Sequence, residues 1–149
     1  MVANLWFFYS LTASILWGVG YVLAEKILKQ TVISPAFLML TATAVTLPLY
    51  AALCVYLGEF KTGMAATFSS PLVFWLVVLH ALTIIGGNFL ILTSVVEKNA
   101  TLVTMIEITY PLFVALFAYL ILKEVQLTWA TAAGAALIFS GVAVIYFKG

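Results

Sequence analysis

The sequence predicts an all-α, polytopic membrane protein, a bundle of five transmembrane helices. Hydrophobic residues make up 66% of the 149 residues, and charged residues only 7%. A water-soluble domain normally carries about 25% charged residues, because its surface faces water. The hydrophobic residues also gather in five stretches of the length that crosses a bilayer, which is about 20 residues. Lipid is therefore the solvent expected around this chain.

Short polar segments separate the five predicted spans. The charged residues are six lysines and five glutamates, and all but one of them lie outside the spans or at their edges. The spans show no alternation of polar and apolar residues, which the strands of a membrane β-barrel require. The segment 58–70 has room for a surface helix. The spans run approximately from Leu5 to Ala24, Pro35 to Leu57, Leu72 to Val96, Leu102 to Leu122 and Thr128 to Phe147.

The chain has no linker or low-complexity stretch, so residues 1–149 are expected to form a single transmembrane domain. The first span lacks a basic leader and a clear cleavage site, so we expect it to be retained. The expected location is the cell membrane, that is, the inner or plasma membrane. Because five is an odd number of spans, the two termini are expected on opposite sides of it. Four lysines are expected on the side of the membrane that holds the C-terminus, and two on the other side. Because lysine concentrates on the cytoplasmic side, this favours a cytoplasmic C-terminus, although insertion in both orientations stays open. The four are Lys26, Lys29, Lys98 and Lys148, and the two are Lys61 and Lys123.

The composition argues against several classes of function. The net charge is +1 and no basic cluster occurs, so nucleic acid is not an expected partner. The single cysteine, Cys54, allows neither an intrachain disulfide nor a multi-cysteine metal site. The sequence holds no nucleotide-binding loop, nucleophile elbow or zinc-protease motif. We therefore expect no enzyme, no metal and no cofactor.

One charged residue, Glu107, lies inside a predicted span. Burying a carboxylate at bilayer depth costs about 2.5–3.5 kcal/mol on insertion scales, so such a group normally faces the bundle interior or a water-filled cavity. It also avoids this cost by taking up a proton. Pro111 has no N–H and deprives the Glu107 carbonyl of its helical donor, which predicts a hinge. The pattern is typical of a proton-coupled or cation-binding site; the alternative is a neutral, structural Glu107 bonded to a neighbouring helix.

Polar and aromatic side chains of other spans share helix faces and are predicted to line a cavity with Glu107. This nearly uncharged lining favours a small amphipathic or aromatic solute over a phosphate. Alternatives remain, because Trp and Tyr also form interfacial belts, and Ser and Thr also serve helix packing. His80 lacks a second His or Cys, so we favour a structural or pore-lining role over metal ligation. The candidates are Trp17, Tyr21, His80 and Asn88, together with Tyr110 from the same span as Glu107, and the polar or small residues on or beside these faces are Ser10, Ser14, Thr43, Thr46, Tyr50, Thr83 and Gly87.

Small residues predict where helices pack closely in lipid. Ser14 and Gly18 form a small-xxx-small pair in the first span, and Gly134 and Gly141 mark the last span. They support a packed bundle or a dimer without distinguishing the two. Pro48 is a second candidate hinge, in the second span.

Three stretches carry motifs in the order and spacing of a known family. They are a Trp-Gly segment at 16–22, the Glu-Ile-Thr-Tyr-Pro segment at 107–116, and Leu-Lys-Glu at 122–124 followed by a Gly-rich helix at 134–142. Together they resemble one EamA-type repeat of the drug/metabolite transporter superfamily, over essentially the whole chain. The resemblance implies half of a ten-helix transporter built from two inverted five-helix repeats. A lone repeat would then pair with a second copy, in an antiparallel or a parallel homodimer, or with a homologous repeat.

These observations predict a small dimeric transporter that exports a small organic solute in exchange for protons. Glu107 is the expected coupling or substrate-binding carboxylate. The family covers amino acids, drugs, nucleosides and other metabolites, so the resemblance does not supply the substrate. Two alternatives remain: a non-transporting membrane subunit of a larger complex, and a subunit of a lipid-linked-sugar translocase. In each case membrane lipid surrounds the protein.

Overall fold

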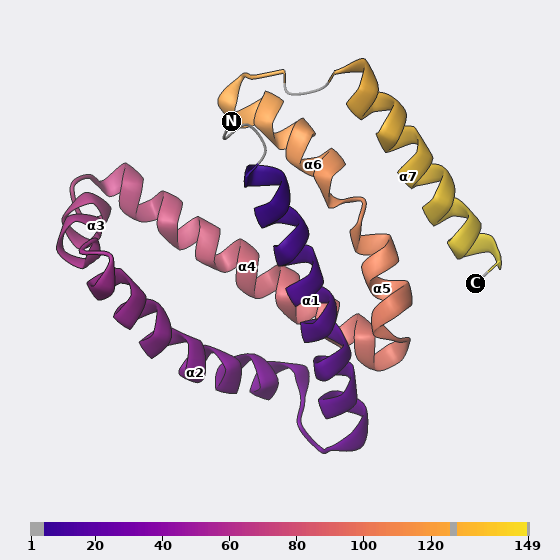
Figure 1. Ribbon diagram of the computed structural model, residues 1–149, viewed down its shortest axis with the longest axis horizontal. Coiled ribbons are helices and arrows are strands. Elements are labelled where there is room, and N and C mark those ends of the chain that lie inside the picture. Colours follow the sequence, from indigo (N-terminus) through magenta and orange to yellow (C-terminus); the bar gives the residue numbers. More distant parts are fainter. Residues whose placement is uncertain (1–4, 126–127, 149) are drawn as a thin grey trace. The chain divides into compact units, whose positions relative to one another are not determined.

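The computed structural model describes residues 5–125 and 128–148, which form helices and no strand (Figure 1). The chain divides into two compact units, Met1–Glu97 and Lys98–Gly149. Five helical segments among the described residues are long and apolar enough to cross a membrane, and they confirm the predicted all-α fold with five spans. These segments are Leu5–Gln30, Pro35–Tyr56, Pro71–Glu97, Ala100–Leu122 and Trp129–Phe147.

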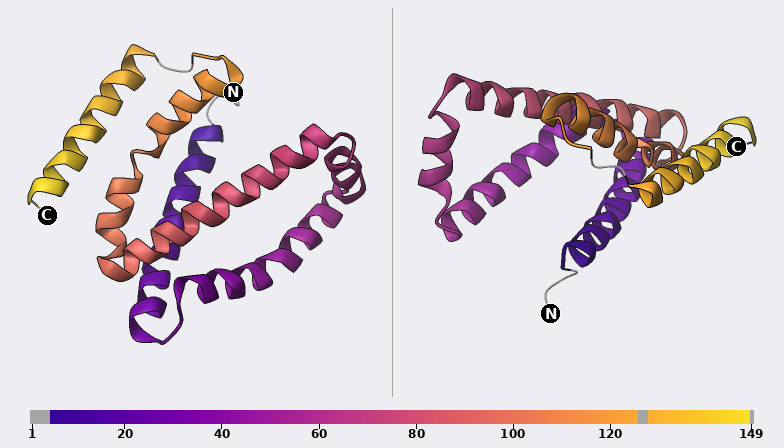
Figure 2. Two further views of the ribbon diagram at one scale, coloured as in Figure 1. Left: turned by 180° about the vertical axis from the view of Figure 1, so that it is seen from behind. Right: turned by 90° about the horizontal axis from the view of Figure 1, so that it is seen from above.

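The first unit contains three long helices and one short helix. α4 contacts each of the other three, and α2 also contacts α1 and α3. The short helix α3 lies in the segment where the sequence has room for a surface helix. Figure 2 shows it joining the end of α2 to the start of α4. The helices are α1 (Leu5–Gln30), α2 (Pro35–Tyr56), α3 (Phe60–Thr67) and α4 (Pro71–Glu97).

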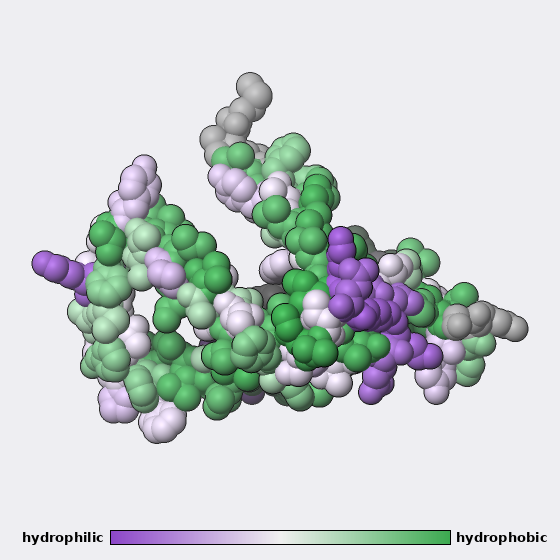
Figure 3. Space-filling view, turned by 90° about the horizontal axis from the view of Figure 1, so that it is seen from below, coloured by the Kyte–Doolittle hydropathy of each residue, from purple (hydrophilic) through white to green (hydrophobic). Residues whose placement is uncertain are grey.

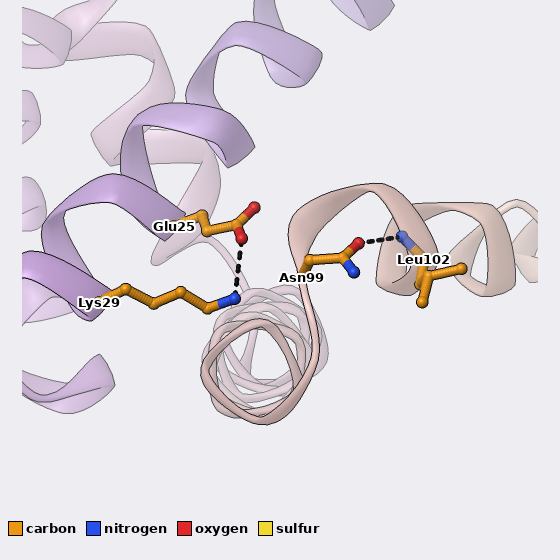
Figure 4. Close-up of polar contacts among 4 residues, drawn as sticks. All are labelled: Glu25, Lys29, Asn99 and Leu102. Atoms are coloured by element: carbon orange, nitrogen blue, oxygen red, sulfur yellow. Dashed lines mark hydrogen bonds and ion pairs between the residues drawn. The ribbon is translucent and has the colours of Figure 1, made fainter. Parts of the chain in front are cut away.

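α1 continues beyond the predicted end of the first span at Ala24 and ends at Gln30. Its last turns carry an ion pair, with Lys29 Nζ 2.9 Å from Glu25 Oε1 (Figure 4). Residues four apart lie on the same face of a helix, so this pair supports helical structure outside the hydrocarbon. The charges mark where the apolar span ends, and the helix itself extends further.

Serine followed by proline begins two of the long helices. The Ser34 hydroxyl accepts a hydrogen bond from the Phe37 N–H at 3.2 Å, and Pro35 opens α2. The Ser70 hydroxyl accepts one from the Val73 N–H at 3.2 Å before Pro71 opens α4. A serine cap satisfies one of the free N–H groups of the first turn, and proline costs nothing at the first helical position.

The second unit contains the fourth and fifth spans. The fourth span is divided into α5 (Ala100–Glu107), α6 (Tyr110–Phe117) and a π-helical turn, η1 (Ala118–Leu122). Asn99 caps α5, since its Oδ1 accepts a hydrogen bond from the Leu102 N–H at 2.8 Å (Figure 4). The fifth span is α7 (Trp129–Lys148), which contacts α5.

Most large hydrophobic side chains are not covered by other residues of the chain. Figure 3 shows a face on which hydrophobic residues predominate and hydrophilic residues occupy small areas. A lipid environment makes this arrangement stable, because lipid tails are as apolar as the side chains that they cover. The buried hydrophobic residues in the described part of the chain are Leu28, Val95, Ala100, Val103 and Ala118.

The glycines of the small-residue motifs make no close contact within the described part of the chain. A Cβ atom added to Gly18, Gly134 or Gly141 would meet no other heavy atom within 4 Å. Ser14, the partner of Gly18 in the motif, donates its hydroxyl to the Ser10 carbonyl of its own helix at 3.0 Å. A helix-packing role for these residues, in a packed bundle or in a dimer, therefore stays a prediction.

Candidate functional site

The fourth span is interrupted directly after Glu107. α5 ends at Glu107 and α6 begins at Tyr110, so Ile108 and Thr109 lie outside both helices. The Thr109 N–H donates to the Ile106 carbonyl at 3.1 Å, which is a tighter turn than an α-helix allows. The Thr109 hydroxyl donates to the same carbonyl at 2.9 Å. The predicted departure from a regular helix at this position is therefore present.

Pro111 explains why the helix restarts here. It occupies the first turn of α6, where the N–H groups have no helical partner in any case. In an unbroken helix the same proline would remove one hydrogen bond and clash with the preceding turn, at a cost of about 3 kcal/mol. Dividing the span places proline where it is tolerated. Whether the break also acts as a hinge stays a prediction.

The break places Glu107 at the C-terminal end of a helix inside the fourth span. Glu107 is the last residue of α5 and is half-buried within the chain. Carbonyl groups point out of the C-terminal end of a helix, which therefore carries a partial negative charge and favours a bound cation or proton. Discontinuous spans of transporters use helix C-termini and unwound carbonyls to hold coupling ions. Tyr110, another predicted site residue, opens α6 on the other side of the break and is exposed.

The first unit holds a cavity of about 610 Å³ between α1, α2 and α4. Its size lies within the usual range for small-molecule sites, which is about 300–1,000 Å³. The described residues that line it carry no charged side chain. Its polar groups are Thr43, Thr46, Tyr50 and Asn88, which share this cavity as the sequence predicts. The apolar part of the lining comes from Gly20, Leu23, Ala24, Ile27, Leu38, Met39, Ala42, Leu47, Ile84 and Leu92.

The face of α1 that lines this cavity is not the predicted polar face. Trp17 and Tyr21 are not among the described lining residues, whereas Gly20 and Ala24 are. At 100° per residue, the two faces differ by about a quarter of a turn. Trp17 is exposed and Tyr21 is half-buried, so their binding roles stay predictions. Gly20 and its apolar neighbours carry no polar group that would mark them in the sequence as lining residues.

The remaining predicted residues of the first unit lie outside the described lining of this cavity. His80 is exposed on α4, and its carbonyl accepts a hydrogen bond from the Thr83 hydroxyl at 2.8 Å. Pro48 lies inside α2, which continues as a single helix from Pro35 to Tyr56. α2 therefore accommodates its proline without the interruption seen in the fourth span. Neither residue is placed in a binding role by this geometry.

A smaller cavity, of about 380 Å³, lies in the second unit between α6 and α7. Pro111 and Ala115 line it from α6, and Gly134 and Ala135 line it from α7. Thr131 is the only polar residue among its described lining residues. Glu107 and Tyr110 belong to this unit, and Asn88 belongs to the other. A site shared by Glu107 and Asn88 therefore stays a prediction.

Comparison with protein families identifies the family to which the chain belongs. The model of the EamA-like transporter family matches residues 4–147. This match covers all five spans, including the break after Glu107 and both cavities. Comparison with curated proteins and with solved structures gave no match.

Proposed function

Because the chain belongs to the EamA-like transporter family, we propose that it exports a small organic solute in exchange for protons, as a dimer. The observation that carries the proposal is the interrupted fourth span, which ends α5 at a carboxylate in the middle of an apolar segment. Glu107 is the proposed coupling residue. It binds either a proton or the solute, so that movement of one is tied to movement of the other.

The cavity of the first unit supports the choice of solute. Its described lining combines uncharged hydrogen-bonding groups with broad apolar walls. Asn88 offers both a donor and an acceptor, and Thr43, Thr46 and Tyr50 offer hydroxyl groups. A solute with an apolar body and one or two polar groups satisfies such a lining. A phosphate or polyanion would require arginine or lysine.

The proposed dimer supplies a second repeat. One five-helix repeat provides half of the helices of a ten-helix transporter of this kind, and a second copy of the chain would provide the other half. Five spans are an odd number, and inverted repeats suit alternating access. We therefore propose an antiparallel homodimer. The open glycines of α1 and α7 leave room for helix contacts with the second copy.

The proposal is tested with purified protein in vesicles that contain a pH-sensitive dye. A panel of aromatic amines, amino acids and nucleosides is added outside, and proton movement across the membrane is followed. At least one solute should drive proton flux with the wild type. Glu107→Gln should abolish this flux, because glutamine cannot exchange a proton, while the protein remains folded.

Glu97→Gln is the matched control. Glu97 is also the last residue of its helix, but it is exposed and lies at the end of a span. This variant should retain the wild-type flux. Unchanged flux in Glu107→Gln would remove Glu107 from the mechanism. If the wild type moves no protons and co-purifies with a stoichiometric partner, the non-transporting subunit becomes the better account.

A further inference from the structure

The connection between α2 and α4 is built from defined turns. At the end of α2 the Gly58 N–H donates to the Val55 carbonyl at 3.1 Å, and the Glu59 N–H donates to the Cys54 carbonyl at 2.9 Å. This pair of bonds is a Schellman motif, which ends a helix at a residue of positive φ. Gly58 supplies that conformation, with φ of +72°. The chain therefore leaves α2 in a fixed direction and enters α3.

The neighbouring helices place α3 at the membrane surface. α2 and α4 are both long and apolar enough to cross a membrane. Only residues 57–59 separate α2 from α3, and only residues 68–70 separate α3 from α4. Because these links are short and α3 contacts both helices, α3 lies at the level where both spans leave the bilayer.

One side of α3 carries a stripe of large apolar side chains. Phe60 and Met64 in α3, and Phe68 directly after its last residue, follow one another at intervals of four residues, so they lie on the same side of this segment. Their exposed fractions are 45%, 49% and 64%, so the chain itself leaves roughly half of each uncovered. Thr62 lies about half a turn away from the stripe and is also exposed.

Ring contacts continue this stripe onto the first turns of α4. Phe68 stacks on Phe74, with ring centroids 5.7 Å apart, and Phe74 meets Trp75 edge to face at 5.6 Å. Trp75 is 64% exposed. Tryptophan and other aromatic residues concentrate at the membrane–water interface, where an apolar ring and a polar edge are both accommodated.

We propose that α3 is an interfacial anchor whose partner is the lipid surface. Phe60, Met64, Phe68 and Trp75 insert at the boundary between headgroups and acyl chains, as the apolar face of an interfacial helix does. Glu59 and Lys61 flank the start of the helix and balance each other in charge. Apolar insertion therefore drives the contact, and attraction to anionic lipid does not. The anchor holds α2 and α4, which line the larger cavity, at a fixed depth.

Spin labels on the full chain in phosphatidylcholine vesicles test this proposal. Cys54→Ser removes the native thiol, and Met64→Cys or Thr62→Cys then carries a nitroxide. Accessibility to oxygen, which dissolves in lipid, is compared with accessibility to a water-soluble nickel chelate. The logarithm of the oxygen-to-nickel ratio should be positive at 64 and negative at 62. The proposal is overturned if the label at 64 faces water, or if it is immobilised and shielded from both reagents, as in a protein interface.

A second measurement leaves α3 unaltered. Trp75 is kept as the single tryptophan by replacing Trp6, Trp17 and Trp129 with phenylalanine. Lipids brominated near the headgroup should quench its fluorescence more strongly than lipids brominated at the chain ends. Stronger quenching from the chain ends, or from a water-soluble quencher alone, would contradict an interfacial position. Neither measurement depends on transport, so the anchor and the proposed function fail independently.

Discussion

The helix break between Glu107 and Pro111 is explained by backbone constraints that act between residues close in the sequence. Proline removes one helical donor whatever the tertiary structure, and the carbonyl that loses it belongs to Glu107. The structure resolves this conflict by ending α5 at Glu107 and restarting the helix at Tyr110. Thr109 supports the turn through two hydrogen bonds to the Ile106 carbonyl. The resulting break places Glu107 at the C-terminal end of a helix inside the fourth span.

Asn88 permits a direct test of the larger cavity. Asn88→Leu keeps a similar side-chain volume but removes both hydrogen-bonding groups. A lost hydrogen bond to a neutral solute costs about 1–1.5 kcal/mol, so the apparent affinity for an amphipathic solute should fall about tenfold. The measurement is the solute concentration that gives half-maximal proton flux. Ser94→Ala is the control, because Ser94 donates to the Leu90 carbonyl of its own helix and is not among the described lining residues.

Local helical spacing accounts for part of the lining of the larger cavity and leaves the rest undetermined. Thr43, Thr46, Tyr50 and Asn88 share a cavity because helical spacing places them on inward faces. The first helix presents Gly20 to that cavity instead of Trp17. Polarity does not decide orientation in lipid, because an apolar side chain is stable facing either a lipid tail or a neighbouring helix. Which face of α1 turns inward therefore depends on packing, and the sequence does not specify it.

At the scale of elements, the five spans were predictable, whereas several helix ends were not. Hydropathy locates the part of each helix that lies in lipid, and charged residues mark its edges. α1 nevertheless continues through Glu25 and Lys29 to Gln30, since an ion pair four residues apart is compatible with a helix in water. The end of α2 is set instead by a Schellman motif, which requires a residue of positive φ.

Gly58 and Gly63 form a matched pair that tests this helix end. An added Cβ atom at either position meets no described atom within 4 Å, and only Gly58 has a positive φ. Gly58→Ala should lower the free energy of unfolding by about 1–2 kcal/mol, because alanine is strained in this conformation. Gly63→Ala lies inside α3 and should raise stability by up to about 1 kcal/mol. Thermal unfolding in detergent measures the stability of both variants. Equal changes in stability would contradict the Schellman motif at Gly58.

At the scale of the whole molecule, the sequence predicts one repeat but does not identify its partner. Most large hydrophobic side chains remain exposed within the chain, and the glycines of α1 and α7 are open. Lipid covers part of this surface, and we propose that a second copy covers another part. The interface depends on two surfaces matching each other, and hydropathy patterns do not encode that match.

Cysteine labelling tests the antiparallel arrangement. With Cys54 replaced by serine, single cysteines are introduced at Thr62 on α3 and at Gln30 at the end of α1. The span α2 lies between these two positions in the chain, so they are expected on opposite sides of the membrane. In sealed vesicles a membrane-impermeant reagent should label each cysteine from outside to about half, because an antiparallel dimer presents both ends on both sides. Complete labelling of one position and none of the other would show a single orientation and exclude this dimer.

The central claim is that proton and solute compete for the carboxyl group of Glu107. The most direct measurement is proton release when a transported solute binds to the purified protein in weakly buffered detergent solution. Wild type and Glu97→Gln should release protons on binding, with a stoichiometry that depends on pH. Glu107→Gln should release none. Equal proton release from Glu107→Gln and wild type would show that the exchanged proton comes from another group.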